Sequence, residues 1–413
     1  MLDRPTANRV LIYSHDTFGL GHLRRCRAIA HALVERRDDV SVLILSGSPI
    51  IGSFDFSPRV DFVRIPGVTK RRDGEYSALT LDMGVDEVLG LRAALIRHTA
   101  EAFRPDLFIV DKEPLGLRGE VAETLAFLKA RGVPLVLGLR DVLDEPALLA
   151  PEWQRKNVLP ALKTLYDELW VYGLPEVCDP LEGVAVPPSV RRKMRYTGYL
   201  RREAPEAEAT SKAGGAPEPP FILVTPGGGG DGEALVDWVL RAYESDPGIP
   251  WRALVVLGPF MHADRRDAFL ARAAALPQVT ATVFESRLES LMRASAGVVA
   301  MGGYNTFCEI LSFDRPALIV PREVPRREQY IRAARAADLG LVAMLVDDGE
   351  RRAEDMAAAL HRLPMQPPPS SAPMPGLLDG LDAVARLAGR HLARPAAAVR
   401  RPRPQPAAEL AYG

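Results

Sequence analysis

Short runs of apolar, often β-branched residues alternate with longer stretches of helical periodicity along most of the chain. The runs are 10–14, 40–46, 60–65, 107–111, 134–139 and 169–172 in the first half, and 221–225, 253–257, 279–284, 297–301, 317–320 and 341–345 in the second. Continuous apolar runs bounded by turns are typical of strands that are buried on both faces. Strands that alternate with helices form parallel sheets with right-handed crossovers. The sequence therefore predicts an α/β protein with two doubly wound sheets.

Proline marks the borders between these parts. The 36 prolines crowd into 204–220, 364–375 and 395–405, which lack apolar periodicity and cannot build a core. We expect an N-terminal domain over 1–203, a linker over 204–220, a C-terminal domain over 221–375, a helix over 376–394 that crosses back onto the first domain, and a disordered tail over 395–413. Ligands bind at the carboxyl ends of such strands, so the two domains should face each other across a central cleft.

Composition excludes several classes of protein. The 413 residues carry 52 basic and 53 acidic side chains, and this balance argues against nucleic acid as a partner. Three widely spaced cysteines fit a reducing compartment and exclude a disulfide scaffold or a zinc module. The absence of a long apolar window and of a signal-peptide pattern predicts a cytoplasmic protein without a transmembrane segment. The sequence contains no Asp-x-Asp motif and no cluster of potential ligands that would indicate a metal site.

The first functional candidate is the loop over 14–22, which lies between a strand and a helix and contains His15, Gly21 and His22. Glycine lets the backbone approach a ligand, and a histidine at a cleft can act as a general base near neutral pH. The alternative is that the histidines cap the helix or bond to backbone. Asp111 and Asp141 follow other strands, and either acid could orient a histidine or cap what comes after it.

The second candidate is the glycine-rich loop over 225–232, Thr-Pro-Gly-Gly-Gly-Gly-Asp-Gly. It satisfies G-x-G-x-x-G after a strand, but the acid expected at the tip of the next strand is missing. No Lys-Ser or Lys-Thr follows, so it is not a P-loop. The loop could wrap a phosphate or let two domains approach closely, and a plain tight turn is the alternative.

The third candidate is Gly302-Gly303-Tyr304-Asn305-Thr306, which follows a strand and opens a helix that continues to Glu309. Glycines at a helix N-terminus form an anion site, and a carboxylate one turn further on could accept hydrogen bonds from a ribose diol. Thr306 and Glu309 also have the spacing of a capping box, which would satisfy the helix's own amides. Spacing alone leaves both interpretations open.

Two further loops end strands of the second half. The segment 321–329 carries three arginines between two prolines, which suits contact with a phosphate or carboxylate, although a solvated charged loop is equally compatible. The strand over 279–284 ends at Phe284, and the loop 284–287 follows it.

Together these motifs resemble the GT-B glycosyltransferases. The resemblance rests on the glycine-histidine loop, the glycine-rich loop of the second domain, and Gly-Gly-x-Asn-Thr-x-x-Glu followed about 20 residues later by Glu-Gln, and it covers nearly all of 10–395. It is strongest to the lipid II N-acetylglucosaminyltransferase and UDP-glucuronosyltransferase group, and HDTFGLGHLRR resembles the bacterial "predicted glycosyltransferase" proteins. Where relatives have a proline shortly after the glycine-histidine, this chain has Leu-Arg-Arg.

The resemblance implies two facing Rossmann-like domains, the first on the acceptor side and the second binding a nucleotide-sugar. The implied donor contacts are Gly302, Gly303, Asn305 and Thr306 to the diphosphate, Glu309 to the ribose, Glu328 and Gln329 to the sugar, Phe284 to the base, and Gly228, Gly229 and Gly230 to the phosphates or the acceptor. In the first domain, His22 is the best match to the catalytic base, with Gly21 beside it. His15 and Asp111 are the other catalytic candidates.

The implied activity is inverting, metal-independent hexosyl transfer from an NDP-sugar, which we expect to be UDP-linked. The donor is a co-substrate, and no cofactor is expected. The acceptor is a small molecule, a lipid-linked molecule or a glycan, and a basic cluster over 191–202 leaves peripheral contact with the inner membrane face open. The alternatives are a nucleotide-sugar 2-epimerase or hydrolase on the same scaffold, or a non-catalytic nucleotide-binding protein.

Overall fold

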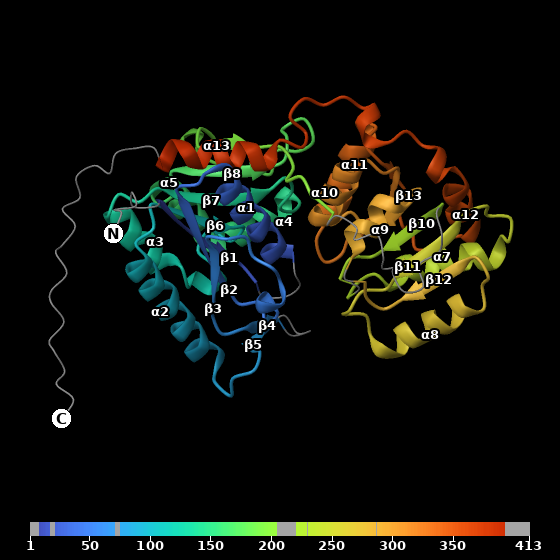
Figure 1. Cartoon of the computed structure of the whole chain (residues 1–413), viewed down its shortest axis with the longest axis horizontal. Coiled ribbons are helices and arrows are strands. Elements are labelled where there is room, and N and C mark those ends of the chain that lie inside the picture. Colours follow the sequence, from blue (N-terminus) through green and yellow to red (C-terminus); the bar gives the residue numbers. More distant parts are fainter. Residues whose placement is uncertain are drawn as a thin grey trace.

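The chain forms two parallel β-sheets, each covered by helices on both faces (Figure 1). The computed structural model describes residues 8–16, 21–70, 75–204, 220–228, 230–285 and 287–392. Each of the apolar runs contains a strand, so the prediction of two doubly wound α/β sheets is confirmed. Most of the predicted linker, the predicted tail and Gly229 lie outside the described residues.

The first sheet has seven strands in the order β3-β2-β1-β6-β7-β8-β9, and all neighbours are parallel. The strands are β1 (Asn8–Ser14), β2 (Val40–Ser46), β3 (Val60–Arg64), β6 (Leu107–Asp111), β7 (Leu135–Arg140), β8 (Glu168–Tyr172) and β9 (Met194–Tyr196). The helices of this half are α1 (Gly21–Arg36), α2 (Val85–Phe103), α3 (Ala122–Ala130), α4 (Pro146–Arg155), α5 (Val158–Thr164) and α6 (Pro188–Arg191). The strand order reverses between β1 and β6.

The second sheet has six strands in the order β12-β11-β10-β13-β14-β15, again parallel throughout. The strands are β10 (Phe221–Thr225), β11 (Arg252–Val256), β12 (Val279–Thr282), β13 (Gly297–Ala300), β14 (Ala317–Ile319) and β15 (Ala343–Met344). The helices are α7 (Glu233–Ser245), α8 (Ala263–Ala274), α9 (Leu288–Ala294), α10 (Tyr304–Phe313), α11 (Glu328–Asp338), α12 (Ala353–Arg362) and α13 (Gly380–Leu392). Here the order reverses between β10 and β13.

Alternate side chains of the central strands enter different cores, which is why these strands are apolar at every position. Val10 and Ile12 of β1 pack with α1 and α13, whereas Leu11 and Tyr13 pack with α2 and α3 on the other face. In the same way β10 contributes side chains to one core with α7 and α12 and to a second with α9 and α10. Each sheet is therefore the middle layer of three.

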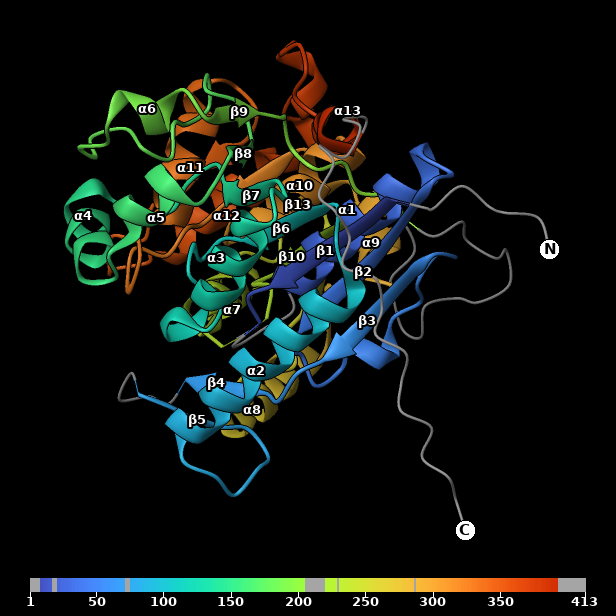
Figure 2. The same ribbon diagram turned by 90° about the vertical axis from the view of Figure 1, so that its left-hand side faces the viewer.

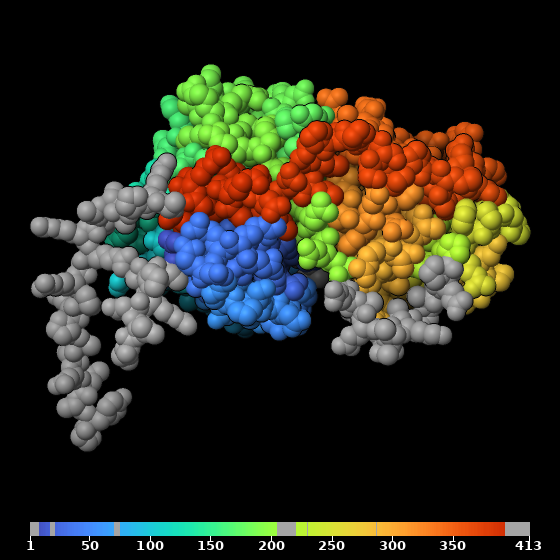
Figure 3. Space-filling view, turned by 45° about the horizontal axis from the view of Figure 1, so that its top comes forward, coloured from blue at the N-terminus to red at the C-terminus, as the bar shows by residue number. Residues whose placement is uncertain are grey.

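The last helix leaves the second domain and lies on the first. α13 packs against α1, and its Val384 and Ala388 join the core that contains Val10 and Ile12. Figure 3 shows this C-terminal segment (red) running across from the second domain onto the first.

A short antiparallel hairpin projects from the first domain, and the sequence did not predict it. It consists of β4 (Val68–Lys70) and β5 (Tyr76–Ala78), and it lies beside α2 (Figure 2). β9 was not predicted either. These strands have three residues each, too few for an apolar pattern to stand out from a loop.

A buried ion pair joins the two domains. Arg332 of α11 donates from Nε and Nη2 to the two carboxylate oxygens of Asp141, which follows β7, at 2.7 and 2.6 Å. Both side chains are 0% exposed, and Tyr199 Oη donates a further hydrogen bond to Asp141 at 2.8 Å. The third donor, Arg332 Nη1, bonds to the carbonyl oxygen of Gly302 at 3.0 Å. The pair thus has the additional hydrogen bonds that a buried ion pair needs.

We predict that Arg332→Met lowers the free energy of unfolding by about 3–5 kcal/mol, because it leaves the carboxylate of Asp141 buried without its partner. Urea unfolding measures the change. Arg335→Met is the control, since Arg335 lies on the same helix with a 54% exposed side chain and a distant partner, Glu182, at 3.9 Å. Equal effects of the two substitutions would contradict the prediction.

Candidate functional site

Most of the predicted functional residues lie at the carboxyl ends of the strands on either side of the two points where strand order reverses. His15 follows β1, His22 lies in the first turn of α1 and Asp111 ends β6, while the loops after β10 and β13 carry the two glycine-rich motifs. A doubly wound sheet binds ligands at this position. The two edges meet, because Asn305 Nδ2 donates to the carbonyl oxygen of Gly21 at 3.0 Å. The N-termini of α1 and α10 therefore face each other across the domain interface.

His22 is paired with Asp111. Its Nδ1 lies 2.5 Å from Asp111 Oδ2, and Arg25 approaches the same carboxylate with Nε and Nη2, each at 2.7 Å. A carboxylate on Nδ1 selects the tautomer with the proton on Nδ1 and leaves the Nε2 lone pair free to accept a proton. Among the two acids left open by the sequence, Asp111 orients the histidine, whereas Asp141 serves the domain interface.

Burial governs the charges of this group. Burial lowers the pKa of His22, and although Asp111 opposes this shift, the imidazole is neutral at pH 7. Burial alone would raise the pKa of Asp111, but Arg25 and His22 together hold it well below its usual range. The site thus combines a neutral imidazole with a permanently ionised carboxylate, the state that a general base requires.

His15 lies behind His22 and is nearly enclosed, with 6% of its surface exposed. Its Nδ1 is 3.4 Å from Tyr13 Oη, and its ring meets that of His22 edge to face at 5.6 Å between centroids. Burial lowers the pKa of His15 from 6.5 to about 3. Neither histidine caps α1, because Asp16 Oδ1 accepts the backbone N–H of Leu23 at 3.1 Å.

Glu309, the expected ribose contact, is bound to the first domain. Its Oε1 accepts from Arg24 Nη2 at 2.6 Å, and the same nitrogen is paired with Glu289. Glu309 is 1% exposed, and burial raises its pKa while Arg24 limits the rise. The capping-box alternative is wrong, since the N-cap of α10 is Gly303 and Thr306 lies inside the helix. The carboxylate of Glu309 therefore has no role within its own helix.

Asn305 is held between the domains as well. Its Oδ1 accepts from Arg202 Nη2 at 2.9 Å while its Nδ2 bonds to Gly21. Gly302, with φ +77°, has no room for a side chain, because a Cβ there would lie 2.7 Å from Ile319. Gly303 is open, with nothing within 4 Å of a Cβ. The turn thus leaves open space beside the half-buried Gly303, in front of the helix N-terminus.

Glu328 and Gln329 open α11 and are both buried. Arg322 binds both side chains. Its backbone N–H donates to Gln329 Oε1 at 3.2 Å, and its Nη2 donates to Glu328 Oε1 at 2.9 Å. Arg322 Nε also lies 2.6 Å from Asp231 Oδ2, which connects the glycine-rich loop to this group. Glu328 Oε2 is buried without a hydrogen-bond partner among the described residues. A buried acceptor of this kind fits a ligand hydroxyl.

Phe284 and the glycine-rich loop lie at the same edge of the second sheet. Phe260 N bonds to Gly228 O at 3.0 Å, and the backbone of Val283 binds Gly258 N at 2.9 Å. Gly228 and Gly230 are exposed, and Phe284 is 58% exposed. This edge therefore offers an uncovered aromatic ring and open backbone to a ligand.

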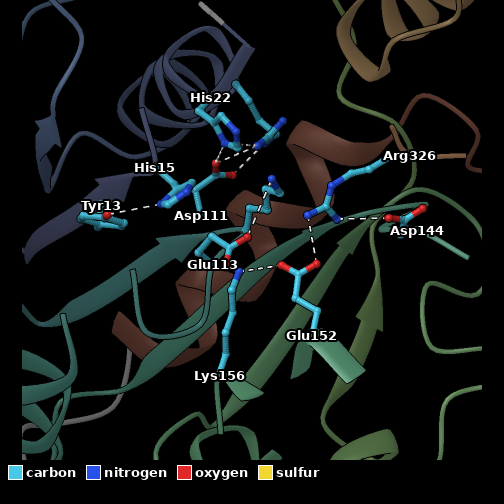
Figure 4. A network of polar contacts seen from close by, with 11 residues as sticks. Tyr13, His15, His22, Asp111, Glu113, Asp144, Glu152, Lys156 and Arg326 are labelled. Carbon is cyan, nitrogen blue, oxygen red and sulfur yellow. Dashed lines mark hydrogen bonds and ion pairs between the residues drawn. The ribbon is translucent and has the colours of Figure 1, made fainter. Parts of the chain in front are cut away.

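The arginines of 321–329 are partly exposed and paired with carboxylates, and two of them reach the first domain. Arg326 binds Asp144 at 3.3 Å and Glu152 at 2.9 Å, and Arg327 binds Glu145 at 3.1 Å. Figure 4 shows Arg326, Glu152, Lys156 and Glu113 forming a chain of contacts that faces His15, His22 and Asp111. The interface thus brings this chain of polar contacts up to the side of the group formed by the histidines and Asp111.

Sequence reasoning missed several arginines that build the site. Arg24, Arg25, Arg202 and Arg332 each bond to a predicted functional residue or to Asp141, and none was proposed. The only signal was the Leu-Arg-Arg that replaces a proline after the glycine-histidine. In the described part of the chain, no group of three or more potential ligands is placed to hold a metal. No helix there combines the length and hydropathy that a membrane span needs.

We predict that His15 makes the protein sensitive to acid. In the unfolded chain a histidine binds a proton below about pH 6.5, whereas the folded His15 stays neutral until about pH 3. Because the unfolded state then binds more protons, the free energy of unfolding falls as pH falls through this range. The loss attributable to His15 is about 2 kcal/mol between pH 7.5 and 5. Urea unfolding at both values should show a smaller loss for His15→Gln, whereas substitution of the exposed His98 leaves it unchanged. An undiminished loss in His15→Gln would refute the assignment.

Three kinds of similarity to known proteins bear on this site. Residues 223–376 match the family described as the glycosyltransferase family 28 C-terminal domain. The chain is 24% identical over 352 residues to an "Uncharacterized glycosyltransferase" of Methanosarcina acetivorans, which covers 79% of this chain and 83% of that protein.

Solved structures of glycosyltransferases share the whole fold. The calicheamicin glycosyltransferase CalG4 aligns with a TM-score of 0.59 at 15% identity over 94% of this chain and 99% of its own. MurG of Acinetobacter baumannii aligns with the same TM-score at 13% identity over 93% and 99%, and VinC in complex with DTDP at 0.59 and 19% identity over 93% and 98%. The chain has the GT-B fold, its second domain matches the C-terminal domain of glycosyltransferase family 28, and it is a glycosyltransferase.

Proposed function

We propose that the protein transfers a sugar from a nucleotide-sugar, expected to be UDP-linked, to a hydroxyl group of an acceptor, with inversion and without a metal. The observation that carries the proposal is the contact of Asn305 with Gly21, which sets the His22–Asp111 pair opposite the glycine-led N-terminus of α10. One side of the interface thus offers a base, and the other offers an anion site. The donor is a co-substrate, and no cofactor takes part.

The donor would lie along the second domain. Backbone at Gly302 and Gly303 and the side chains of Asn305 and Thr306 are proposed to hold the diphosphate, where the dipole of α10 favours negative charge. Glu309 would accept the ribose hydroxyls, exchanging its ion pair with Arg24 for them. Further along, Glu328 and Gln329 would bind the sugar, a role that the unpartnered Glu328 Oε2 supports.

The base of the nucleotide would lie near the glycine-rich loop. We assign Phe284 and its loop to the base, because the ring is largely uncovered. Gly228–Gly230 would approach the phosphates or the acceptor. The acceptor is a small molecule, a lipid-linked molecule or a glycan, and it would enter from the first domain. Three buried free cysteines, Cys26, Cys178 and Cys308, favour the cytoplasm as the place of action.

The chemical step follows from the orientation of His22. Its Nε2 takes the proton of the acceptor hydroxyl as the oxygen forms a bond to the anomeric carbon. The bond from that carbon to the diphosphate oxygen breaks, and its electron pair leaves with the diphosphate. Asp111 stabilises the imidazolium that results, and the N-terminus of α10 stabilises the charge on the leaving group. His15 would support the His22 ring without exchanging a proton, because burial keeps it neutral.

We predict that Glu309→Gln weakens UDP binding at least tenfold, because charge-assisted hydrogen bonds to the ribose are lost. Isothermal titration with UDP, GDP and dTDP measures it and identifies the base. Glu289→Gln is the matched control, since Glu289 pairs with the same Arg24 nitrogen but has no proposed contact with the donor. Its UDP affinity should remain within about threefold of wild type. Failure of all three nucleotides to bind would refute the donor site.

We predict that His22→Ala reduces acceptor-dependent release of nucleoside diphosphate by roughly 10²–10⁴-fold, the usual contribution of a general base. The Kd for the nucleotide should stay the same, which separates loss of the base from loss of the donor site. His98→Ala controls for removal of a histidine at the surface. Consumption of the donor without any acceptor would instead favour the 2-epimerase or hydrolase, and full activity of His22→Ala would exclude His22 as the base.

A further inference from the structure

Among the described residues, the cations near the histidines form close ion pairs with carboxylates, with two exceptions. The matched pairs are Arg25 with Asp111, Arg332 with Asp141, Arg322 with Glu328, Arg326 with Asp144 and Glu152, and Lys156 with Glu113 and Glu152. The exceptions are Arg140, which forms no ion pair with a described residue, and Lys112, whose ion pair with Glu113 is long at 3.8 Å. Both side chains are partly buried, and a charge withdrawn from water without a close partner is costly.

Arg140 is the clearer case. It is the last residue of β7 and directly precedes Asp141, yet its guanidinium makes no hydrogen bond or ion pair with any described residue. Its Nε is fully enclosed. The guanidinium therefore has unused donors in a fixed planar fork, the arrangement that binds carboxylate and phosphate oxygens two at a time.

Lys112 stands at the end of the neighbouring strand, β6, and follows Asp111. Its nearest carboxylate oxygen, Glu113 Oε1, is 3.8 Å away, and Glu113 already bonds to Lys156 at 2.9 Å. The backbone of Lys112 has φ +67°, a conformation that costs energy for a residue with a side chain. Strain of this kind persists where the surrounding structure needs a side chain in a particular direction.

The pKa shifts of Lys112 and Arg140 also support a binding site for an anion. Burial lowers the pKa of Lys112 to about 8, and Arg140 contributes to the shift. Burial also lowers the pKa of Arg140 to about 10, with Arg332 as the next cause. Arg140 thus disfavours the charged form of Lys112, and an anion bound near both side chains would stabilise their charges.

These cations are separate from the proposed diphosphate site. They belong to the first domain, on the acceptor side, and follow the strands adjacent to the His22–Asp111 pair. Lys112 also lines a pocket with Glu113, Trp153 and Arg326, next to the network of Figure 4. The diphosphate has its own place at the N-terminus of α10 in the second domain.

We propose that Arg140 and Lys112 bind a carboxylate or phosphate group of the acceptor, so that the protein selects an anionic acceptor. The proposal rests on the proposed transferase function, and it adds the chemical class of the second substrate. The anion fixes the acceptor while its hydroxyl approaches His22, and a neutral acceptor would leave Arg140 unpaired and Lys112 with only its long contact to Glu113.

The test is isothermal titration of the full chain, saturated with UDP, with inorganic phosphate, with glucuronate and with glucose. We expect saturable binding of phosphate or glucuronate and none of glucose. If phosphate binds and glucuronate does not, the acceptor is assigned a phosphate group. If glucuronate binds and phosphate does not, the acceptor is assigned a carboxylate. Arg140→Gln and Lys112→Gln should each weaken anion binding about tenfold or more. Arg140→Lys should lose less than Arg140→Gln, and the exposed-site variant Arg335→Gln should bind as wild type.

Several outcomes would overturn the proposal. They are the absence of anion binding to the UDP complex, equal binding by Arg140→Gln and wild type, and displacement of UDP by the anion, which would assign the two cations to the donor's diphosphate. The Kd for UDP is measured with each variant and should be unchanged, which also shows that the variant is folded. If UDP binds no form of the protein, the proposed function fails instead, and phosphate titrated into the chain without UDP still tests the two cations.

Discussion

The ion pair between Asp141 and Arg332 determines how the two domains meet. Both charges are withdrawn from water, so neither can leave its partner without a large cost in free energy. Arg332 also binds the carbonyl of Gly302, and Asp141 directly follows Arg140, so the pair links the donor turn of one domain to the strand end of the other. Apolar contacts reinforce it, since the rings of Tyr199 and Phe307 meet at 5.2 Å between centroids.

The interface is less firm at the start of α1. There Arg24 joins Glu309 and Glu289, and the side chains of Arg24 and Glu289 are 26% and 23% exposed. Partly solvated ion pairs contribute less than buried ones and exchange partners more easily. Donor entry would therefore break the contacts of Arg24 and preserve those of Arg332. The ribose would replace a guanidinium on Glu309, so binding and local opening would be coupled at a single carboxylate.

Sequence patterns predicted the elements because strands buried on both faces must be apolar throughout, and they predicted the site because ligands gather at strand ends. They could not show whether Asp111 or Asp141 orients the histidine, since both lie at the carboxyl ends of buried strands. Only the packing of the domains distinguishes the two acids. They could not detect Arg24 or Arg25, because charges near the start of an amphipathic helix usually face solvent. The unpaired state of Arg140 was equally hidden, since it depends on what every neighbouring carboxylate already binds.

The replacement of a proline by Leu-Arg-Arg has a physical consequence for His22, the proposed base. Arg25 supplies two hydrogen bonds to Asp111 and keeps it ionised, which a proline could not do. The same guanidinium lowers the proton affinity of His22, because it neutralises much of the charge that would stabilise an imidazolium. A base weakened in this way gains from an acceptor held rigidly beside it, since orientation can compensate for proton affinity. The anion site proposed at Arg140 and Lys112 would provide that orientation.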